Sequence, residues 1–230
     1  MIKALNQETL MAKLVIFGTT EMAALTHFYF SHDTSHEVVA FTVDRDHLKE
    51  ETLFGLPIIA FEEAESKCPP SEYKMYIAIR YAKLNKLRSE KYYQAKAKGY
   101  ELVNYISSKA VIWPGLIIGD NCFIAERSTC APSAIIGNNV IIFHNCSIGH
   151  HAVVKDHCYL APNTVLSDGV TVEEYSFVGA NSTVVDNITI ARECVVGAGA
   201  LLLNNTRKKG VYRGNPAKPL PIASEKLKRI

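Results

Sequence analysis

The sequence predicts a chain of two unlike parts, a small α/β domain followed by a parallel β-helix. Two observations carry this prediction. Short apolar strands alternate with helical stretches up to about residue 104, and from Ile106 large aliphatic residues recur at every sixth position. The chain has 230 residues, of which 48% are hydrophobic and 21% charged, a composition that can bury a core and is unlike that of a disordered protein.

The first part has the signals of strands that alternate with helices. Strands are expected at residues 13–17, 36–43, 56–60, 74–79 and 100–104, and helices around 22–30 and over 84–98. Gly99 stands where a glycine commonly ends a helix. This alternation implies a parallel sheet, Rossmann-like in outline, which we assign to residues 1–105. Residues 1–10 precede a second methionine and are expected to be a loosely attached extension.

The second part is an internal repeat with a period of six. Every sixth residue from Ile106 to Leu202 gives seventeen positions, and sixteen of them are Ile, Val or Leu, with Cys130 as the exception. The same count shifted by one residue finds two. Neither a helix nor an ordinary strand has this period, and a β-sandwich would show a period of two with hairpin turns. The repeat therefore indicates an array of stacked structural units.

Small residues such as Ala, Ser, Thr and Cys stand four positions after most of the aliphatic ones, so large and small side chains alternate toward one interior. Three hexads make a triangular coil of 18 residues, each side stacked about 4.8 Å above the last. The pattern resembles the hexapeptide-repeat family, and this resemblance implies a left-handed β-helix. We assign it to residues 106–205, roughly five coils, and treat residues 206–230 as a C-terminal tail.

The residue before each inward aliphatic points outward and forms columns at a spacing of 18. One column is apolar throughout: Phe123, Ile141, Tyr159, Phe177 and Val195. A long exposed apolar stripe indicates an interface or a ligand groove. The resemblance implies a homotrimer, in which a second copy would cover this column.

Charge, hydropathy and cysteine spacing exclude several classes of protein. Lys and Arg number 25 and Asp and Glu 23, a balance that argues against a general nucleic-acid binder. No apolar run reaches the ~18 residues of a membrane span, and the first ten residues lack the apolar core of a secretory signal, so we expect a cytoplasmic protein. Five of the six cysteines fall at inward positions, so we expect slow thiol labelling with Cys68 as the exception.

The whole chain resembles the bacterial NeuD-like and PglD-like sugar acyltransferases. The resemblance rests on the α/β domain, the β-helix and the motif GNPAK at Gly214–Lys218. It implies transfer of an acetyl group from acetyl-CoA to the amino group of a nucleotide-linked sugar. Transfer to a sugar hydroxyl is the first alternative, and a non-catalytic hexapeptide scaffold is the second.

Four histidines fall within a short segment: His144, His150, His151 and His157. Their spacing does not match that of the hexapeptide carbonic anhydrases, so no metal site is predicted. Residues 149–163 align with the family without a gap, which places the family's catalytic base at His150. His151 then replaces an acidic neighbour, and Tyr159 replaces a histidine near the acetyl-CoA thioester. An imidazole suits this role because it titrates near neutral pH.

Asp168 follows His150 by 18 residues and so occupies the equivalent turn of the next coil. Its carboxylate could orient the His150 ring. Alternatively, its backbone N–H could stabilise an oxyanion, as a glycine at this position is thought to do in relatives. The sequence leaves both roles open.

The resemblance also implies where the two substrates bind. Acetyl-CoA is expected to contact Tyr159, Gly179, Gly197, Arg207, Lys208, Arg213, Gly214 and Lys218, whose cations suit its phosphates. The nucleotide sugar is expected at Gly18, Thr19 and Thr20, after the first strand, and at Asp44, which ends the second strand and matches the acidic residue that holds the base or ribose in relatives.

Overall fold

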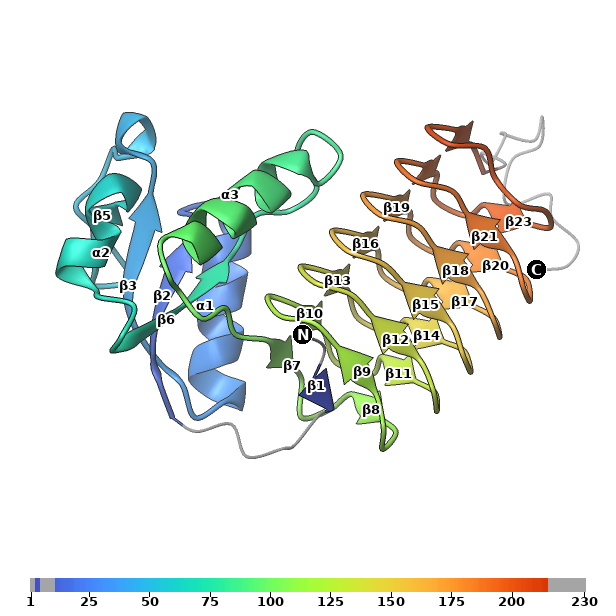
Figure 1. The fold of residues 1–230 in the computed structure, drawn as a ribbon, viewed down its shortest axis with the longest axis horizontal. Helices are drawn as coiled ribbons and strands as arrows, with labels where there is room; N and C mark the ends of the chain where they lie inside the picture. Colours follow the sequence, from blue (N-terminus) through green and yellow to red (C-terminus); the bar gives the residue numbers. More distant parts are fainter. Residues whose placement is uncertain (1–2, 5–10, 215–230) are drawn as a thin grey trace, which may run out of the picture.

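The computed structural model describes residues 3–4 and 11–214, and it places an α/β domain beside one end and one face of a β-helix (Figure 1). The sheet of the α/β domain has the order β4-β5-β3-β2-β6, parallel except for the β4–β5 hairpin. Its strands are β2 (Lys13–Phe17), β3 (Glu37–Val43), β4 (Thr52–Leu53), β5 (Leu56–Ala60) and β6 (Tyr73–Ile77). Its helices are α1 (Glu21–Asp33), η1 (Arg45–His47), η2 (Phe61–Glu63), α2 (Ala64–Lys67) and α3 (Lys86–Ala97).

Alternating side chains of the central strand give this sheet two buried faces. Leu14 and Ile16 point to the face that α1 covers, whereas Val15 and Phe17 point to the face that α2 and α3 cover. The predicted strands at 13–17 and 56–60 are confirmed, and α3 ends just before Gly99. The predicted strand at 100–104 is wrong, because only a single bridge joins Leu102 to Met75.

The β-helix has three parallel sheets, one on each side of a triangular prism. Sheet I contains β7 (Tyr105–Ile106), β10 (Phe123–Ile124), β13 (Ile141–Ile142), β16 (Tyr159–Leu160), β19 (Phe177–Val178), β22 (Val195–Val196) and β24 (Val211–Tyr212). Sheet II contains β8 (Val111–Ile112), β11 (Thr129–Cys130), β14 (Ser147–Ile148), β17 (Val165–Leu166), β20 (Thr183–Val184) and β23 (Leu201–Leu202). Sheet III contains β9 (Ile117–Ile118), β12 (Ile135–Ile136), β15 (Val153–Val154), β18 (Thr171–Val172) and β21 (Thr189–Ile190), with β1 (Lys3–Ala4) at its edge.

The predicted left-handed parallel β-helix is confirmed. Strand pairing shows its 18-residue coil, since Phe123 pairs with Ile141 and Ile141 with Tyr159. The predicted inward aliphatic residues form one continuous buried core along the prism. Asparagines at the corners, among them Asn139 and Asn163, have positive φ angles, which asparagine tolerates better than most residues.

Both ends of the prism extend beyond the predicted repeat. The β-helix begins at Tyr105 in β7 and reaches Tyr212 in β24. Val196 pairs with Tyr212, two residues short of the usual step, so the period of six is broken before this last strand. At the other end β1 pairs antiparallel with β9, which joins the predicted N-terminal extension to the edge of sheet III.

Most of the apolar outward column, from Phe123 to Phe177, is covered within the chain, which corrects the expectation that a second copy covers all of it. Phe123, Ile141 and Tyr159 are buried in one cluster with α1 and the strands of the α/β domain. The α/β domain therefore packs on sheet I. The sequence could not show this, because a stripe made for an intramolecular neighbour looks the same as one made for a partner.

Thiol labelling is expected to be slow at all six cysteines, including Cys68. Every one of them is buried and unpaired, and Cys68 is only 5% exposed, packed between β5, α2 and α3. Burial also raises the pKa of Cys68, and it raises that of Cys122 to about 12, which suppresses the reactive thiolate. Labelling with a thiol reagent before and after unfolding measures this, and fast native labelling of any one thiol contradicts the packing described here.

Candidate functional site

The candidate histidines, Asp168 and most of the predicted acetyl-CoA residues lie at the three corners of the prism. We name each by the two sheets that it joins: the I–II corner follows sheet I, the II–III corner follows sheet II, and the III–I corner follows sheet III. The α/β domain lies on sheet I and contacts the two corners that flank it. Tyr29 and Asp33 hydrogen-bond near the I–II corner, and residues of α3 hydrogen-bond along the III–I corner.

The four histidines are separated by this geometry. His144 lies at the I–II corner, His150 and His151 at the II–III corner, and His157 at the III–I corner. Among residues 3–4 and 11–214, no group of three or more His, Cys, Asp or Glu side chains is arranged to hold a metal ion. Closeness in sequence therefore does not make these residues one site.

His150 is exposed in a tight turn that the next coil supports. The Asp168 carboxylate accepts a hydrogen bond from the backbone N–H of His150 at 2.8 Å, and the N–H of Gly169 donates to the His150 carbonyl at 2.9 Å. Gly149 is required here, because a Cβ atom would lie 2.6 Å from Asp168 Oδ1. The backbone of the turn is thus held while the imidazole faces solvent.

Asp168 connects to the following coil in the same way. Its own backbone N–H donates to Asp186 Oδ1 at 3.2 Å, so this N–H already has a partner. The Asp168 carboxylate accepts its hydrogen bond from the backbone N–H of His150 and not from the imidazole ring. The geometry supports a third role that the sequence did not suggest, in which Asp168 positions the His150 turn through the backbone.

The residues predicted to contact acetyl-CoA lie at two corners of the C-terminal coils. Gly179, Gly197, Arg213 and Gly214 follow successive strands of sheet I at the I–II corner. Arg207 and Lys208 are exposed at the III–I corner, just before β24. Lys218 lies outside the described residues.

Close backbone packing explains the glycines among them. A Cβ atom on Gly179 would lie 2.6 Å from the backbone nitrogen of Ala198, and one on Gly214 would lie 2.2 Å from the carbonyl oxygen of Ala198. These positions therefore need glycine for the stacking of coils, and any cofactor role would be additional.

Tyr159 lies in a different setting from the one predicted. Its ring is 3% exposed, stacks on Phe177 at 5.3 Å between centroids, and makes an edge-to-face contact with Tyr81 of the α/β domain at 5.0 Å. Burial raises the pKa of its hydroxyl. The structure supports a packing role at the joint between the domains, and contact with acetyl-CoA stays a prediction.

The nucleotide-sugar residues lie at the carboxyl edge of the α/β sheet. Gly18 follows β2 with φ of +123°, and its Cβ atom would be 3.0 Å from the carbonyl oxygen of Ala78, so this turn requires glycine. Thr19 and Thr20 lead into α1, and Thr20 is its N-cap. Asp44 follows β3, one strand away. The structure thus brings together the two parts of the predicted site.

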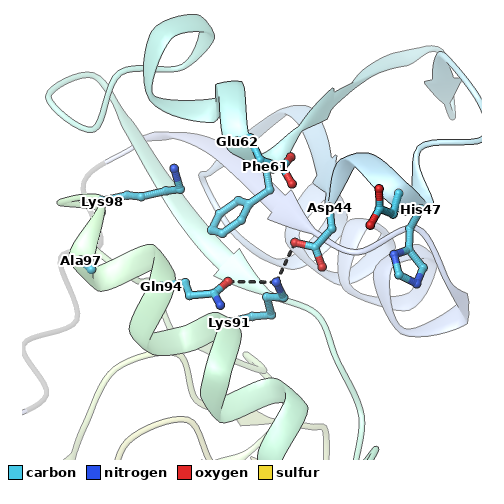
Figure 2. A pocket seen from close by; sticks show the side chains of 9 residues that line it. Asp44, His47, Phe61, Glu62, Lys91, Gln94, Ala97 and Lys98 are labelled. Carbon is cyan, nitrogen blue, oxygen red and sulfur yellow. Dashed lines mark hydrogen bonds and ion pairs between the residues drawn. The ribbon is translucent and has the colours of Figure 1, made fainter.

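A pocket of about 510 Å³ opens beside Asp44 (Figure 2). It is lined by Asp44, Asp46, His47, Phe61, Glu62, Lys91, Gln94, Ala97 and Lys98. Lys91 lies 2.6 Å from Asp44 Oδ1 and 2.9 Å from Gln94 Oε1, and its ammonium lies over the rings of Phe17 and Phe61. This ion pair neutralises the charges of Lys91 and Asp44. The carboxylate oxygens, the Phe61 ring and the Gln94 amide that line the pocket suit a heterocyclic base or a ribose.

Arg88, which the sequence did not indicate as functional, joins the two domains through hydrogen bonds. Its guanidinium is fully buried, and no carboxylate of residues 11–214 pairs with it. It donates to the carbonyls of Asn139, His157 and Cys158 at the III–I corner, at 3.0–3.2 Å, and to the carbonyl of Arg80 at 2.7 Å. Burial lowers its pKa to about 10, so it remains charged at neutral pH. No sequence signal marks Arg88, because it lies within an ordinary helical pattern.

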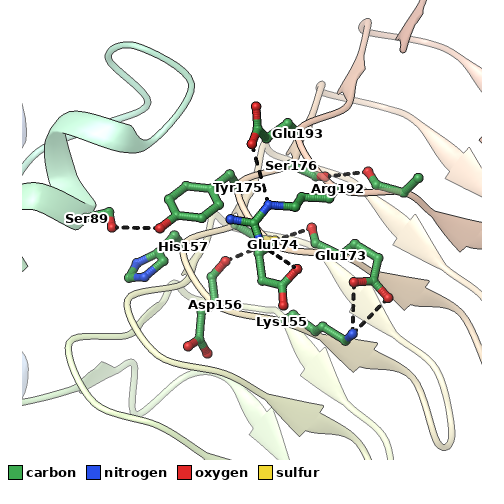
Figure 3. Close-up of polar contacts among 12 residues, drawn as sticks. Ser89, Lys155, Asp156, His157, Glu173, Glu174, Tyr175, Ser176, Arg192 and Glu193 are labelled. Carbon is green, nitrogen blue, oxygen red and sulfur yellow. Dashed lines mark hydrogen bonds and ion pairs between the residues drawn. The ribbon is translucent and has the colours of Figure 1, made fainter. Parts of the chain in front are cut away.

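His157 belongs to the same joint, because its ring lies beside Tyr175, whose hydroxyl hydrogen-bonds Ser89 of α3 (Figure 3). Asn139 Oδ1 accepts from Arg88 and from Asn121, so its amide nitrogen must donate to His157 Nδ1, at 2.8 Å. His157 Nε2 then donates to the hydroxyl of Tyr93 at 3.1 Å. This pattern requires a neutral ring with its proton on Nε2.

Acidification is expected to destabilise the protein through His157. Its pKa is lowered to about 4, mainly by burial; Asp156 opposes this effect, and Arg88 and Arg192 add to it. An unfolded histidine titrates near 6.5, so between pH 6.5 and 4 the unfolded state binds the extra proton and the free energy of unfolding falls as pH falls. The contribution is on the order of 3 kcal/mol.

His157→Asn is the matched comparison, because it continues the asparagine column and suits the positive φ of 62°. We expect its free energy of unfolding, measured by urea titration across this pH range, to fall less steeply than that of the wild type. Equal slopes would show that His157 is not responsible.

A left-handed β-helix behind a Rossmann-like domain, with an exposed turn histidine and a pocket at the carboxyl edge of the sheet, defines a known architecture. A family model described as the GMPPB C-terminal domain matches residues 117–207, inside the β-helix. No curated protein matches the chain.

Several solved structures share the whole architecture. PerB from Caulobacter crescentus, in complex with CoA and GDP-perosamine, is 24% identical, with 90% of this chain and 96% of that chain covered and a TM-score of 0.78. The acetyltransferase domain of PglB from Neisseria gonorrhoeae, in complex with acetyl coenzyme A, is 20% identical, with coverages of 90% and 98% and a TM-score of 0.78. WeeI from Acinetobacter baumannii is 18% identical, with coverages of 92% and 100% and a TM-score of 0.74. The resemblance predicted from the sequence is confirmed at the level of the fold. In the described part of the chain, no helix is long and apolar enough to cross a membrane.

Proposed function

We propose that this protein transfers an acetyl group from acetyl-CoA to the amino group of a nucleotide-linked sugar. The observation that carries the proposal is the match of both domains to PerB, whose structure holds CoA and GDP-perosamine. An exposed histidine at the II–III corner and a polar pocket at the α/β edge supply matching chemistry in this chain.

In the proposed reaction the sugar nitrogen attacks the thioester carbonyl. His150 accepts the proton from the nitrogen as the C–N bond forms, the C–S bond breaks, and the proton passes to the leaving sulfur, so that the products are the amide and CoA. Asp168 holds the backbone of the His150 turn. A general base of this kind contributes about 10²–10⁴-fold to the rate.

The two substrates are proposed to bind on different domains. The edge formed by Gly18, Thr19, Thr20 and Asp44 would take the nucleotide sugar, with its phosphates toward the start of α1. The cations Arg207, Lys208 and Arg213, together with Lys218, would take the phosphates of acetyl-CoA. All described cysteines are unpaired and buried, which suits the reducing cytoplasm that we propose as the location.

We further propose a homotrimer. His150 lies at the II–III corner, whereas its own α/β domain covers sheet I and the other two corners. A neighbouring copy would bring a nucleotide-binding edge to His150, and closed cyclic symmetry would repeat the site three times. Light scattering tests this, and a stable monomer at micromolar concentration contradicts it.

Activity is tested with acetyl-CoA and a panel of UDP-, dTDP- and GDP-linked amino sugars. Thermal shift identifies which nucleotide sugar binds, since a ligand that binds only the folded state raises the melting temperature. Release of the CoA thiol then measures turnover. A product that resists mild alkali is an amide, whereas an alkali-labile product would be the ester of the O-acetylation alternative. Absence of CoA binding and of turnover would favour the scaffold alternative.

A further inference from the structure

The strand order of the α/β sheet reverses at β2. Strand β2 lies between β3 and β6, so the chain winds toward β3 and β5 on one side and toward β6 on the other. Ligands of such sheets bind where the strand order reverses, outside the carboxyl ends of the strands. Gly18 to Thr20 follow β2 at this point, and Arg80 and Tyr81 follow the neighbouring strand β6.

Tyr81 carries an exposed aromatic ring at this edge of the sheet. It is 46% exposed although it makes edge-to-face contacts with Tyr159 and Phe177 on sheet I, both at 5.0 Å between centroids. The Arg80 guanidinium lies 5.9 Å from the Tyr81 ring and 5.8 Å from the Phe143 ring. Tyr81 therefore lies between the nucleotide edge and the β-helix, and its supporting rings fix its position.

Arg80 adds directional polar groups to this ring. Its guanidinium lies 3.8 Å from the Glu21 carboxylate, in the first turn of α1, and both side chains are largely exposed. An aromatic face flanked by a guanidinium and a carboxylate matches a pyranose ring, which offers an apolar face of C–H groups and a rim of hydroxyl or amino groups.

The loop that presents Tyr81 is held in a strained conformation. Lys83, Leu84 and Asn85 have φ angles of 51°, 52° and 63°, three successive residues in the left-handed region without a glycine. Such a run is unfavourable for residues other than glycine, and it persists where the surroundings impose it. Here Asn85 imposes it, because its amide donates to the carbonyls of Tyr175 and Ser176 on the β-helix.

We infer that Arg80 and Tyr81 form the subsite for the sugar ring of the nucleotide sugar, with Tyr81 as the stacking platform. The inference rests on the proposed function and deepens it. The nucleoside lies at Asp44, the phosphates at Gly18 to Thr20, and the sugar continues in the same direction across β2 to Tyr81. This order points the sugar toward the β-helix.

The test compares nucleotides with and without a sugar. The probes are UDP, GDP and dTDP, each alone and as UDP-glucose, GDP-mannose and dTDP-glucose, with affinity measured by calorimetry. For the nucleotide that the wild type binds, Tyr81→Ala is expected to weaken the sugar conjugate about 5–10-fold and to leave the free diphosphate unchanged. Tyr81→Phe keeps the ring and is expected to keep the affinity. Phe28→Ala is the control, because Phe28 is a 54% exposed aromatic residue of the same domain.

Four outcomes would contradict the assignment of Tyr81 to the sugar subsite. Equal losses for diphosphate and conjugate in Tyr81→Ala would overturn the assignment, because the ring would then serve the nucleotide or the fold. No loss for either would overturn it as well. A wild type that binds the diphosphates but gains nothing from any sugar would refute the subsite alone. A wild type that binds none of the probes would refute the proposed function and the subsite with it.

Discussion

Replacing His150 with alanine is expected to lower kcat by about 10²–10⁴-fold while KM for both substrates changes little. The reason is that a general base acts mainly in the transition state, so its loss leaves ground-state binding nearly intact. The fold should survive, because the side chain is exposed in a turn and contributes nothing to the aliphatic stack. Steady-state kinetics measure the effect, and the melting temperature shows whether the variant is folded.

His144→Ala and His151→Ala are the controls. His144 lies at the I–II corner and should matter less, and His151 shares the turn of His150 but does not align with the family base. Asp168→Asn should be nearly silent, because an amide oxygen can still accept the N–H of His150, whereas Asp168→Ala should lower kcat without a change in the pH profile. Near-wild-type turnover of His150→Ala would end this mechanism, and a collapse in His144→Ala would move the base to the I–II corner.

Arg88→Met is expected to lower the free energy of unfolding by about 3–5 kcal/mol. The methionine fills a similar volume but leaves the buried carbonyls of Asn139 and His157 without the Arg88 donor, and each unpaired buried group costs about 1–3 kcal/mol. The Cys158 carbonyl loses Arg88 but keeps the backbone N–H of Ile141. Arg88→Lys should fall between, because one ammonium group cannot reach all the carbonyls that the planar guanidinium spans.

Lys96→Met provides the matched control on the same helix. Lys96 forms an ion pair with Asp120 at 2.5 Å across the same joint, but it is exposed, so its loss should cost less than about 1 kcal/mol. Denaturant unfolding measures all three variants. If Arg88→Met lost no more than Lys96→Met, the buried guanidinium would not be what holds the domains together.

The repeat made the β-helix predictable in detail, because each position from Ile106 to Leu202 repeats one local environment. Beyond the end of the repeat at Leu202 no strand was predicted. Strand β24 was missed because the segment before Tyr212 breaks the six-residue period. The predicted strand at 100–104 has residues with high strand propensity, but only one bridge, from Leu102 to Met75, forms there. The tertiary arrangement therefore outweighs local propensity.

The candidate site was predictable where it follows from a local motif or an 18-residue step. His150 and Asp168 do lie in adjacent turns, as their spacing requires. The partner atoms were not predictable, since a spacing gives the stacked position but does not distinguish a ring from a backbone N–H. The joint made by Arg88 and the position of Tyr81 depend on packing between separate domains, for which the sequence has no period. The clue for Tyr81 was its place directly after a predicted parallel strand.

The stacking of coils also sets fixed distances along the axis of the prism. Each coil adds about 4.8 Å along the axis, and three coil steps separate β14, next to His150, from β23 in the last full coil. If the cations near β24 hold the phosphates of acetyl-CoA, an inserted or deleted coil would shift the thioester by ~5 Å relative to His150 while every strand kept a partner. The number of coils between the two would then be set by the length of the acyl carrier and not by folding stability. A whole-coil deletion would thus yield a folded protein of the wrong length.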